Sequence, residues 1–192
     1  MSDIPLFPLN TVLFPGGPLP LRIFEVRYTD MVRKCMREGT AFGVVLIRGG
    51  GEIGDVSGTA DIGTTARIVD FYQLPEGLLG LSCLGEKRFR VQRRWRQNDG
   101  LNMATVEYLP AEPSQGVPEE YRHLSDLLDK VLPELGDVYQ HVPRHRNDAA
   151  WVGARLIELL PIGLADKQSY LELDDPLERL NRLAPLIRRD VD

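Results

Sequence analysis

Residues 1–28 read MSDIPLFPLNTVLFPGGPLPLRIFEVRY, and this stretch restricts the fold more than any other part of the chain. It holds five prolines, at positions 5, 8, 15, 18 and 20, among many large apolar residues. Proline lacks a backbone N–H and fixes φ, so the stretch cannot be a helix. Its apolar side chains must nevertheless leave water. Short strands at a sheet edge meet both conditions, if proline-fixed bends separate them; the sharpest bend is Phe14-Pro15-Gly16-Gly17-Pro18.

The residues after this stretch predict a β-rich part with one helix. Apolar positions within residues 25–38 form a stripe typical of an amphipathic helix, and Gly39 stands where a C′ glycine belongs. Later apolar runs are separated by turn residues such as Pro75-Glu76-Gly77 and therefore predict strands. These expected strands cover residues 42–47, 65–74, 78–84, 87–95 and 101–109.

The pattern changes after residues 110–116, PAEPSQG, whose composition is typical of a linker. Beyond it the apolar residues recur with the period of a helix, first from Val117 to Val131 and then up to Pro161. The last helix is predicted to begin at Asp175, followed by Pro at N1 and Glu at N3. Strands followed by helices predict an α+β fold, with a β-rich lobe over residues 1–112 and an all-helical carboxy-terminal lobe over residues 117–192.

Composition argues against several classes of protein. A chain with 43% hydrophobic and 27% charged residues is typical of a globular protein, and its net charge of −5 gives no general attraction for nucleic acid or an anionic membrane. No apolar run approaches the ~20 residues that span a bilayer. The amino terminus lacks the basic region and apolar core of a signal peptide. Cys35 and Cys83 are therefore interpreted as reduced thiols of a cytoplasmic protein.

Three motifs suggest chemistry, and each is incomplete. Gly49–Gly54 spells G-x-G-x-x-G, but the acidic, non-helical sequence after it cannot supply the helix N-terminus that holds a pyrophosphate. Gly80–Lys87 completes neither a phosphate-binding loop nor a nucleophile elbow. His141 and His145 are separated by Pro143, which argues against a helix that presents both to a metal. The sequence thus predicts no cofactor, no metal site and no catalytic residues.

Residues 87–96 read KRFRVQRRWR, with six basic residues in ten and two aromatic residues between them. Basic and aromatic side chains on strands occur in proteins that bind single-stranded nucleic acid. In a strand, Arg88, Arg90 and Arg94 would share one face, which makes them a candidate patch for an anion or nucleic acid. The alternative is a solvated face paired with acidic neighbours, which the net charge of −5 favours.

Several segments resemble the Lon protease amino-terminal domain, also called the LON substrate-binding domain. The opening matches in Ile4–Leu9, in Phe14-Pro15-Gly16 and in Pro20–Tyr28. Further similar segments follow in the family's order at residues 63–68, 74–77, 85–91, 159–162, 167–168, 171–172 and 175–180. The resemblance implies a PUA-like pseudo-barrel for the first lobe. It also implies a stand-alone module, since no ATPase or Ser-Lys protease domain of Lon is found in this sequence.

The function that the resemblance implies is non-catalytic recognition of exposed apolar or unfolded polypeptide segments, linked to proteolysis by a separate ATP-dependent protease. Candidate substrate-binding aromatics are Phe14, Phe24, Tyr28 and Tyr72, each of which is otherwise explained as a core residue. A second hypothesis is RNA binding by the PUA-like lobe through residues 87–96, although fold alone does not establish function. A third is a hydrolase that acts without partner domains, for which no nucleophile–base pair is visible.

Overall fold

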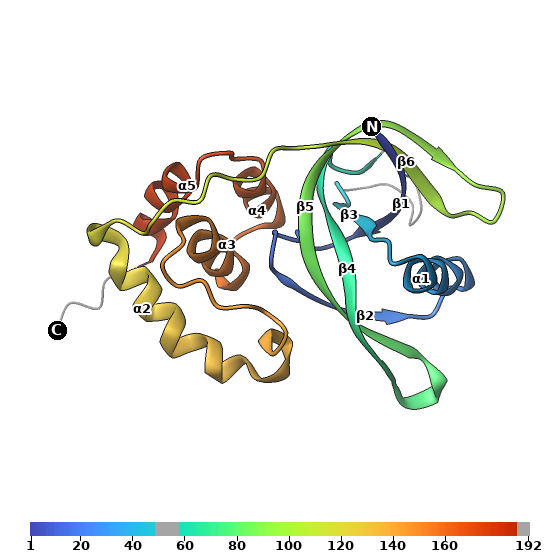
Figure 1. Cartoon of the computed structure of the whole chain (residues 1–192), viewed down its shortest axis with the longest axis horizontal. Helices are drawn as coiled ribbons and strands as arrows, with labels where there is room; N and C mark the ends of the chain where they lie inside the picture. Colours follow the sequence, from blue (N-terminus) through green and yellow to red (C-terminus); the bar gives the residue numbers. More distant parts are fainter. Residues whose placement is uncertain (49–57, 188–192) are drawn as a thin grey trace.

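The structure of the chain is a computed structural model that describes residues 1–48 and 58–187. A β-rich lobe and a helical lobe lie side by side (Figure 1). The strands are β1 (Ser2–Leu9), β2 (Pro18–Ile23), β3 (Phe42–Leu46), β4 (Ile62–Gln73), β5 (Leu79–Arg96) and β6 (Asn102–Tyr108). The helices are α1 (Val26–Glu38), α2 (Arg122–Val131), α3 (Ala149–Leu159), α4 (Leu164–Leu171) and α5 (Pro176–Leu183). Short 3₁₀ helices are η2 (Pro75–Gly77), η3 (Glu119–Tyr121), η4 (Leu132–Tyr139) and η5 (Ala184–Leu186).

The strands form one mixed sheet that closes on itself. Their order is β2-β5-β4-β3-β1-β6, and β6 also pairs with β5. Closure depends on the length of β5, which has 18 residues: its first part pairs with β2 and β4, and its last part pairs with β6. The segments predicted as two strands, 78–84 and 87–95, are therefore one strand. Register shifts against both β4 and β6 accompany its path from one side of the barrel to the other.

β1 lies inside the sheet, so the prediction that its prolines mark an edge is wrong for this strand. β1 pairs in parallel with β3 and antiparallel with β6, and Leu6 has partners on both sides. Pro5 is paired only with β6, and Pro8 only with β3. Each proline can therefore turn its missing N–H toward the side that has no partner strand. The edge prediction is confirmed for β2, which contains Pro18 and Pro20 and pairs only with β5.

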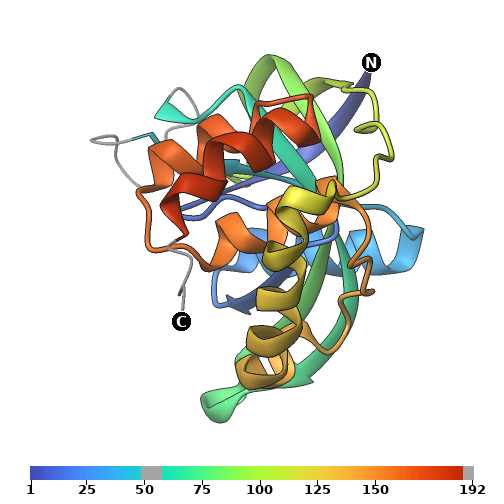
Figure 2. The same ribbon diagram turned by 90° about the vertical axis from the view of Figure 1, so that its left-hand side faces the viewer.

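The helices cover the strands from two sides (Figures 1 and 2). α1 packs its buried residues against one side, and its end at Gly39, with φ of 64°, is the one predicted. α2 to α5 gather on the other side. There, Phe14 and Leu84 of the β-rich lobe belong to the same buried cluster as Leu124 and Ile157 of the helices. The two lobes thus share one hydrophobic core.

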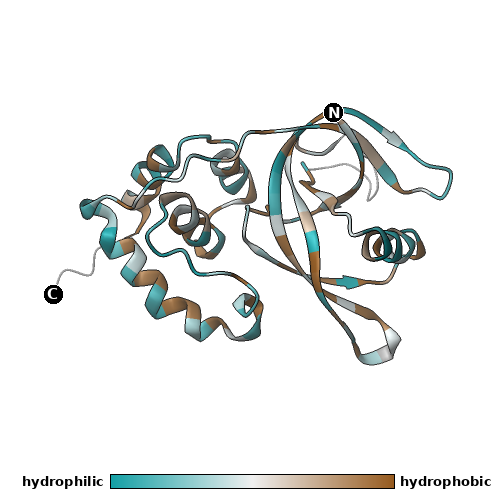
Figure 3. Ribbon diagram, viewed as in Figure 1, coloured by the Kyte–Doolittle hydropathy of each residue, from teal (hydrophilic) through white to brown (hydrophobic). Residues whose placement is uncertain are grey.

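Local signals account for the helix boundaries. The helix predicted from Val117 begins later, at Arg122, because residues 119–121 form a 3₁₀ turn first. Bands of hydrophobic and hydrophilic residues alternate along α2, as the period predicted (Figure 3). α5 begins as predicted: the Asp175 carboxylate accepts a hydrogen bond from the backbone N–H of Leu177, at 2.9 Å, and Pro176 occupies N1.

Candidate functional site

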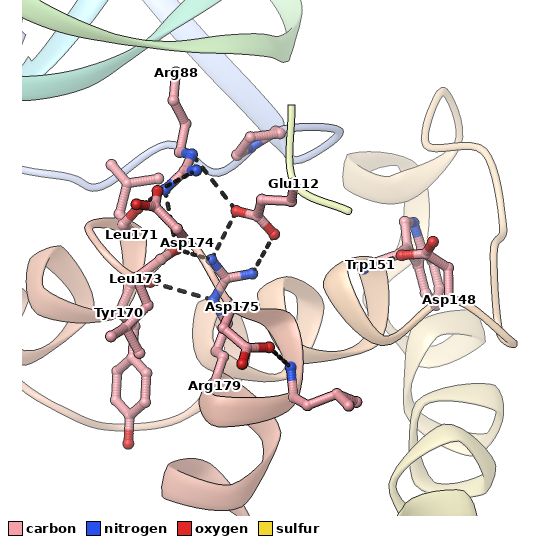
Figure 4. Close-up of polar contacts among 12 residues, drawn as sticks. Arg88, Glu112, Asp148, Trp151, Tyr170, Leu171, Leu173, Asp174, Asp175 and Arg179 are labelled. Atoms are coloured by element: carbon pink, nitrogen blue, oxygen red, sulfur yellow. Dashed lines mark hydrogen bonds and ion pairs between the residues drawn. The ribbon is translucent and has the colours of Figure 1, made fainter. Parts of the chain in front are cut away.

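An ionic network joins the two lobes; it consists of Arg88, Glu112, Asp174 and Arg179 and is called the junction network below (Figure 4). Glu112, in the linker after β6, accepts two hydrogen bonds from Arg179 of α5, at 2.6 and 2.7 Å. Arg88 of β5 lies beside the same carboxylate, with Nε 3.6 Å from Oε1, and forms an ion pair with Asp174 at 2.8 Å. Both arginines are buried and also donate to backbone carbonyls between α4 and α5, such as that of Leu173. The network therefore holds barrel, linker and helices together.

A second buried ion pair lies where α3 meets the amino-terminal bend. Arg155 donates to both carboxylate oxygens of Glu158, at 2.8 and 2.6 Å, and to the backbone carbonyl of Pro15, at 3.1 Å. Tyr139 also donates to Glu158, at 3.1 Å. Burial raises the pKa of Glu158, an effect that the Arg155 charge opposes. This pair attaches the bend predicted from the prolines to the helical lobe.

The glycines of the bend are required by close approach as well as by backbone conformation. Gly16 has φ of +70°, a conformation that side chains other than glycine rarely adopt. A Cβ atom at Gly17 would lie 2.1 Å from Oε1 of Glu158. The bend also pairs with β5, because Gly85 accepts a hydrogen bond from Gly16 N–H, at 2.8 Å, and donates one to the Gly17 carbonyl, at 2.9 Å. Only glycine permits the bend to fit between β5 and α3.

A cavity of about 530 Å³ lies beside these contacts, between β5, the linker and α3, and is called the interlobe cavity. Arg88 and Glu112 of the junction network are in its wall. Its other lining is mainly apolar, from Pro15, Tyr108, Leu109, Pro110, Ala111, Ala150, Trp151 and Ala154. Trp151 is held at the start of α3, where its backbone N–H donates to the N-cap Asp148, at 2.9 Å. The cavity has the apolar character and size of a site for a few side chains.

A second cavity, of about 560 Å³, lies next to α1, the first residues of β1 and the β5–β6 hairpin, and is called the α1 cavity. Glu86, Lys87 and Tyr108 line both cavities. The two cavities are therefore neighbours with these residues as a common wall, in which Nζ of Lys87 lies 5.7 Å from the centroid of the Tyr108 ring. Together they are called the groove, which extends from α1 to α3.

The four aromatics predicted to bind substrate lie in two different environments, and none of them lines the groove. Phe14 is 0% exposed, and Tyr28 is 6% exposed with its ring stacked on Phe7, so both pack in the core. Phe24 is 74% exposed and Tyr72 is 42% exposed. Both lie toward the β4–β5 hairpin, where the Tyr72 ring covers Gly80 of the neighbouring strand.

The three arginines predicted to form a basic patch do not share one exposed face. Arg88 is only 4% exposed because the helical lobe covers it, and its charge is used in the junction network. Arg94 forms an ion pair with Asp61 at 2.5 Å, and only Arg90 is fully on the surface. The alternation of side chains between the two faces of the strand, on which the patch was predicted, is also interrupted after Val91, where β5 shifts register against β6. This arrangement gives the RNA-binding hypothesis no support.

Several sequence predictions concern absent features or other parts of the chain. Within residues 1–48 and 58–187, no group of three or more His, Cys, Asp or Glu side chains is placed to hold a metal ion. The glycine motif at Gly49–Gly54 lies outside the described residues. In the same part of the chain, no helix has the length and apolar character to cross a membrane.

Sequence reasoning missed Trp151 and Leu109 as groove residues, because an apolar residue next to a groove has the same sequence pattern as one in the core.

Comparison with known proteins identifies the region of other proteins that this chain resembles. The family model for the ATP-dependent protease La (LON) substrate-binding domain matches residues 3–189. The Lon protease of Cytophaga hutchinsonii is 26% identical over 199 residues, which cover 99% of this chain and 24% of that protein. The protein cereblon of Danio rerio is 32% identical over 117 residues, which cover 57% of this chain and 26% of that protein. The chain thus spans about a quarter of the length of these relatives.

Solved structures agree on the fold. The Lon N-terminal domain protein from Xanthomonas campestris matches with a TM-score of 0.79 and 37% identity, over 98% of this chain and all of that one. The N-terminal domain of Mycobacterium avium complex Lon protease matches with a TM-score of 0.64 over 99% of this chain; at 16% identity, this likeness concerns the fold alone. The predicted fold class, a β-rich pseudo-barrel followed by helices, is confirmed. The chain therefore belongs to the LON substrate-binding domain family.

Proposed function

We propose that this chain recognises exposed apolar or unfolded segments of other polypeptides and performs no catalysis itself. The observation that supports this proposal best is the interlobe cavity of about 530 Å³, whose walls include Tyr108, Leu109 and Trp151, the last of which is itself only 8% exposed. Tyr108 is 42% exposed at the meeting point with the α1 cavity. An extended segment would therefore find room on both sides of an apolar side chain inserted there. The family to which the chain belongs agrees with this function.

The proposal includes a partner and a location. We propose that the chain presents such segments to a separate ATP-dependent protease in the cytoplasm. The Lon proteases that match it carry a similar region as about a quarter of their length, which motivates the link to proteolysis. Cys35 and Cys83 are both free and buried, as is usual in a reducing compartment.

Binding by this groove should be weak. Burial of one apolar side chain contributes roughly 1.5–3 kcal/mol, and the interlobe cavity has room for only a few such groups. Association costs about 4–15 kcal/mol in lost translational and rotational freedom. The balance leaves affinities on the order of high micromolar to millimolar. Weak and broad binding suits a module that samples many unfolded segments.

The test measures binding of a permanently unfolded polypeptide to the wild-type chain and to three variants. Ala150→Arg places a long side chain in the interlobe cavity, and Tyr108→Ser removes a ring from its mouth. Phe24→Ser is the matched control, because Phe24 is exposed and apolar but lines neither cavity. Thermal unfolding verifies that each variant is folded.

We expect the two groove variants to lower the affinity about tenfold, which corresponds to ~1.4 kcal/mol, and Phe24→Ser to leave it unchanged. Saturable binding that is lost with Phe24→Ser and retained in both groove variants would assign recognition to the exposed aromatics near the β4–β5 hairpin. A wild-type chain that binds no unfolded polypeptide would refute the proposed function itself.

A further inference from the structure

One side of β4 lacks a partner strand over much of its length, and we infer that an extended segment of an unfolded polypeptide is added to the sheet there. Within residues 1–48 and 58–187, β3 pairs with β4 from Thr64 to Ala66, and no strand pairs with that side of β4 beyond this point. Residues 67–73, which pair with β5 alone, are called the open edge. They lie on the hairpin that projects from the barrel (Figures 1 and 2). The inference rests on the proposed function for the class of partner, but none of these residues lines the groove.

The hydrogen-bonding pattern shows which backbone groups of the open edge face away from β5. In an antiparallel pair, residues that bond to the partner strand alternate with residues that do not. The N–H of Leu74 bonds across the hairpin, at 2.8 Å, so Phe71 and Gln73 turn their N–H and carbonyl groups to the other side. The Phe71 N–H accordingly donates to the side-chain carboxylate of Asp70, at 2.8 Å. The open edge therefore presents the backbone groups of two residues to an added strand.

The sheet protects β2 against such pairing more completely than it protects β4. β2 pairs only with β5, and Pro18 and Pro20 have no N–H to offer a further strand. Proline on an edge strand is one device by which proteins prevent edge-to-edge pairing. β4 contains no proline, and its protection consists of a register shift between Ile68 and Asp70 and of the Asp70 carboxylate itself. Residues 70–73, beyond that shift, are all exposed.

Two hollows flank the open edge, one on each face of the sheet. The first, of about 310 Å³, is lined by Phe71 and by Met36 of α1. The second, of about 470 Å³, is lined by Tyr72 and by Val138 and His141 of the helical lobe. Successive side chains of a strand point to opposite faces, so an added strand would direct alternate side chains into the two hollows. In β-strand addition, main-chain hydrogen bonds supply affinity and pockets accept alternate side chains, and the open edge offers both.

An unfolded segment fits the open edge better than a second copy of this chain. The part of the open edge that keeps a regular register against β5 beyond the shift is residues 70–73. Pairing of so short a stretch with its own copy would bury far less than the ~1,200–2,000 Å² of a stable interface. An unfolded segment does not need such an area, because it can take any register and place side chains in both hollows.

The test uses a short peptide of alternating Thr and Val with a lysine at each end, which favours the extended conformation and has no aromatic anchor for the groove. Binding to the wild-type chain is followed by NMR titration of backbone amide signals. We expect saturable shifts at Phe71 and Gln73. The same peptide with N-methyl groups on alternate residues keeps its side chains but cannot donate along one edge, and it should bind at least about tenfold more weakly.

Variants assign the pairing to the open edge. Gln73→Pro removes an N–H that faces away from β5, so the variant should fold, as thermal unfolding verifies, and bind the peptide roughly three- to tenfold more weakly. Gln73→Thr is the matched control, because it keeps the N–H and should bind as the wild type does. Asp70→Ala should bind about two- to fivefold more tightly, because the Phe71 N–H then has no competing acceptor. Ala150→Arg, which fills the interlobe cavity, should leave the affinity unchanged.

Several outcomes would overturn the inference while leaving recognition by the groove intact. These are equal affinity for the methylated and unmethylated peptides, equal affinity of Gln73→Pro and Gln73→Thr, and loss of peptide binding in Ala150→Arg. Dimerisation of the wild type that Gln73→Pro abolishes, measured by analytical ultracentrifugation, together with no response to the peptide, would assign the open edge to a second copy. The proposed function fails separately, if the wild-type chain binds neither the peptide nor a permanently unfolded polypeptide.

Discussion

Replacement of Glu112 by Gln tests whether the junction network holds the two lobes together. Glu112 is the carboxylate shared by Arg88 and Arg179, and the side chains of these three residues are 10%, 3% and 1% exposed. Glutamine keeps the size of the side chain and one acceptor oxygen but removes the charge. Within the junction network, Arg179 would then have no carboxylate partner, and Arg88 would keep only that of Asp174, which is itself 84% exposed.

The expected cost follows from this burial. Removal of one partner from a buried ion pair destabilises a protein by about 3–5 kcal/mol, because the other charge stays buried without compensation. In a chain of this length, each kcal/mol lowers the midpoint of thermal unfolding by about 2–4 °C. We therefore expect Glu112→Gln to lower that midpoint by roughly 6–20 °C.

The assay is urea unfolding and thermal unfolding of the wild type and of two variants. Glu178→Gln is the matched control, because Glu178 forms an ion pair with Arg182 on the same α5 but both side chains are about half exposed, at 45% and 54%. Such an exposed pair contributes only about 0.2–1 kcal/mol. The two variants lose the same charge, so a difference between them reports burial.

A free energy of unfolding for Glu112→Gln within about 1 kcal/mol of that of Glu178→Gln would refute this reasoning. A second variant gives an independent measurement. Glu112→Leu combined with Arg179→Met removes both charges of the bidentate pair, and it should recover part of the stability lost by Glu112→Gln, because no unpaired charge remains at that position.

Three further predictions concern the bend, the buried acid and the thiols. Gly17→Ala should lower the free energy of unfolding, measured with urea, by at least about 2 kcal/mol, because its Cβ atom would lie 2.1 Å from Glu158 Oε1. Gly116→Ala, with open space around it, should lower the same free energy by less than about 1 kcal/mol. Equal losses in the two variants would contradict the geometry. Burial raises the pKa of Glu158 above its ordinary 4.5, so the stability that its protonation contributes is complete below that pH and is lost as pH rises through the folded-state pKa. The free energy of unfolding of the wild type relative to Glu158→Gln should therefore decrease as pH rises from about 4.5, and a constant or rising difference would show that the folded-state pKa is not raised. Burial raises the pKa of Cys83 to about 12 and also raises that of Cys35. Iodoacetamide at pH ~8, with labelling followed by mass spectrometry, should therefore modify neither thiol until urea unfolds the chain. Rapid labelling of the folded protein would contradict the burial of these thiols.

Local chemistry made several elements predictable from the sequence. The helix that ends at Gly39 and the helix that starts at Asp175 depend on residues within one turn of the boundary, and both are found where predicted. The turn at Pro75–Gly77 and the change from strands to helices depend equally on nearby residues. The resemblance to the LON family rests on the order of such short segments, and the family match over residues 3–189 confirms it.

Contacts between distant segments explain where sequence reasoning failed. Arg88 follows the alternation of a strand, but its environment depends on Glu112 and Arg179, which lie far along the chain and belong to other elements. The local sequence around Phe14 would be the same whether its ring lined a groove or lay in the core. The packing of the helices on the barrel is what buries it. The same limit applies to the proline-containing β1, whose place inside the sheet depends on pairing with β3 and β6.

The proline-bent strands near the start of the chain and the capped amphipathic helices later in it can be read from the residues alone, because both follow from the conformational limits of individual residues and the burial of a regular apolar face. The closure of the barrel by β5, and the cavity that Tyr108, Pro110 and Trp151 line together, emerge only from three-dimensional packing. Strand register and lobe packing are set by contacts among segments tens of residues apart, which no local pattern records.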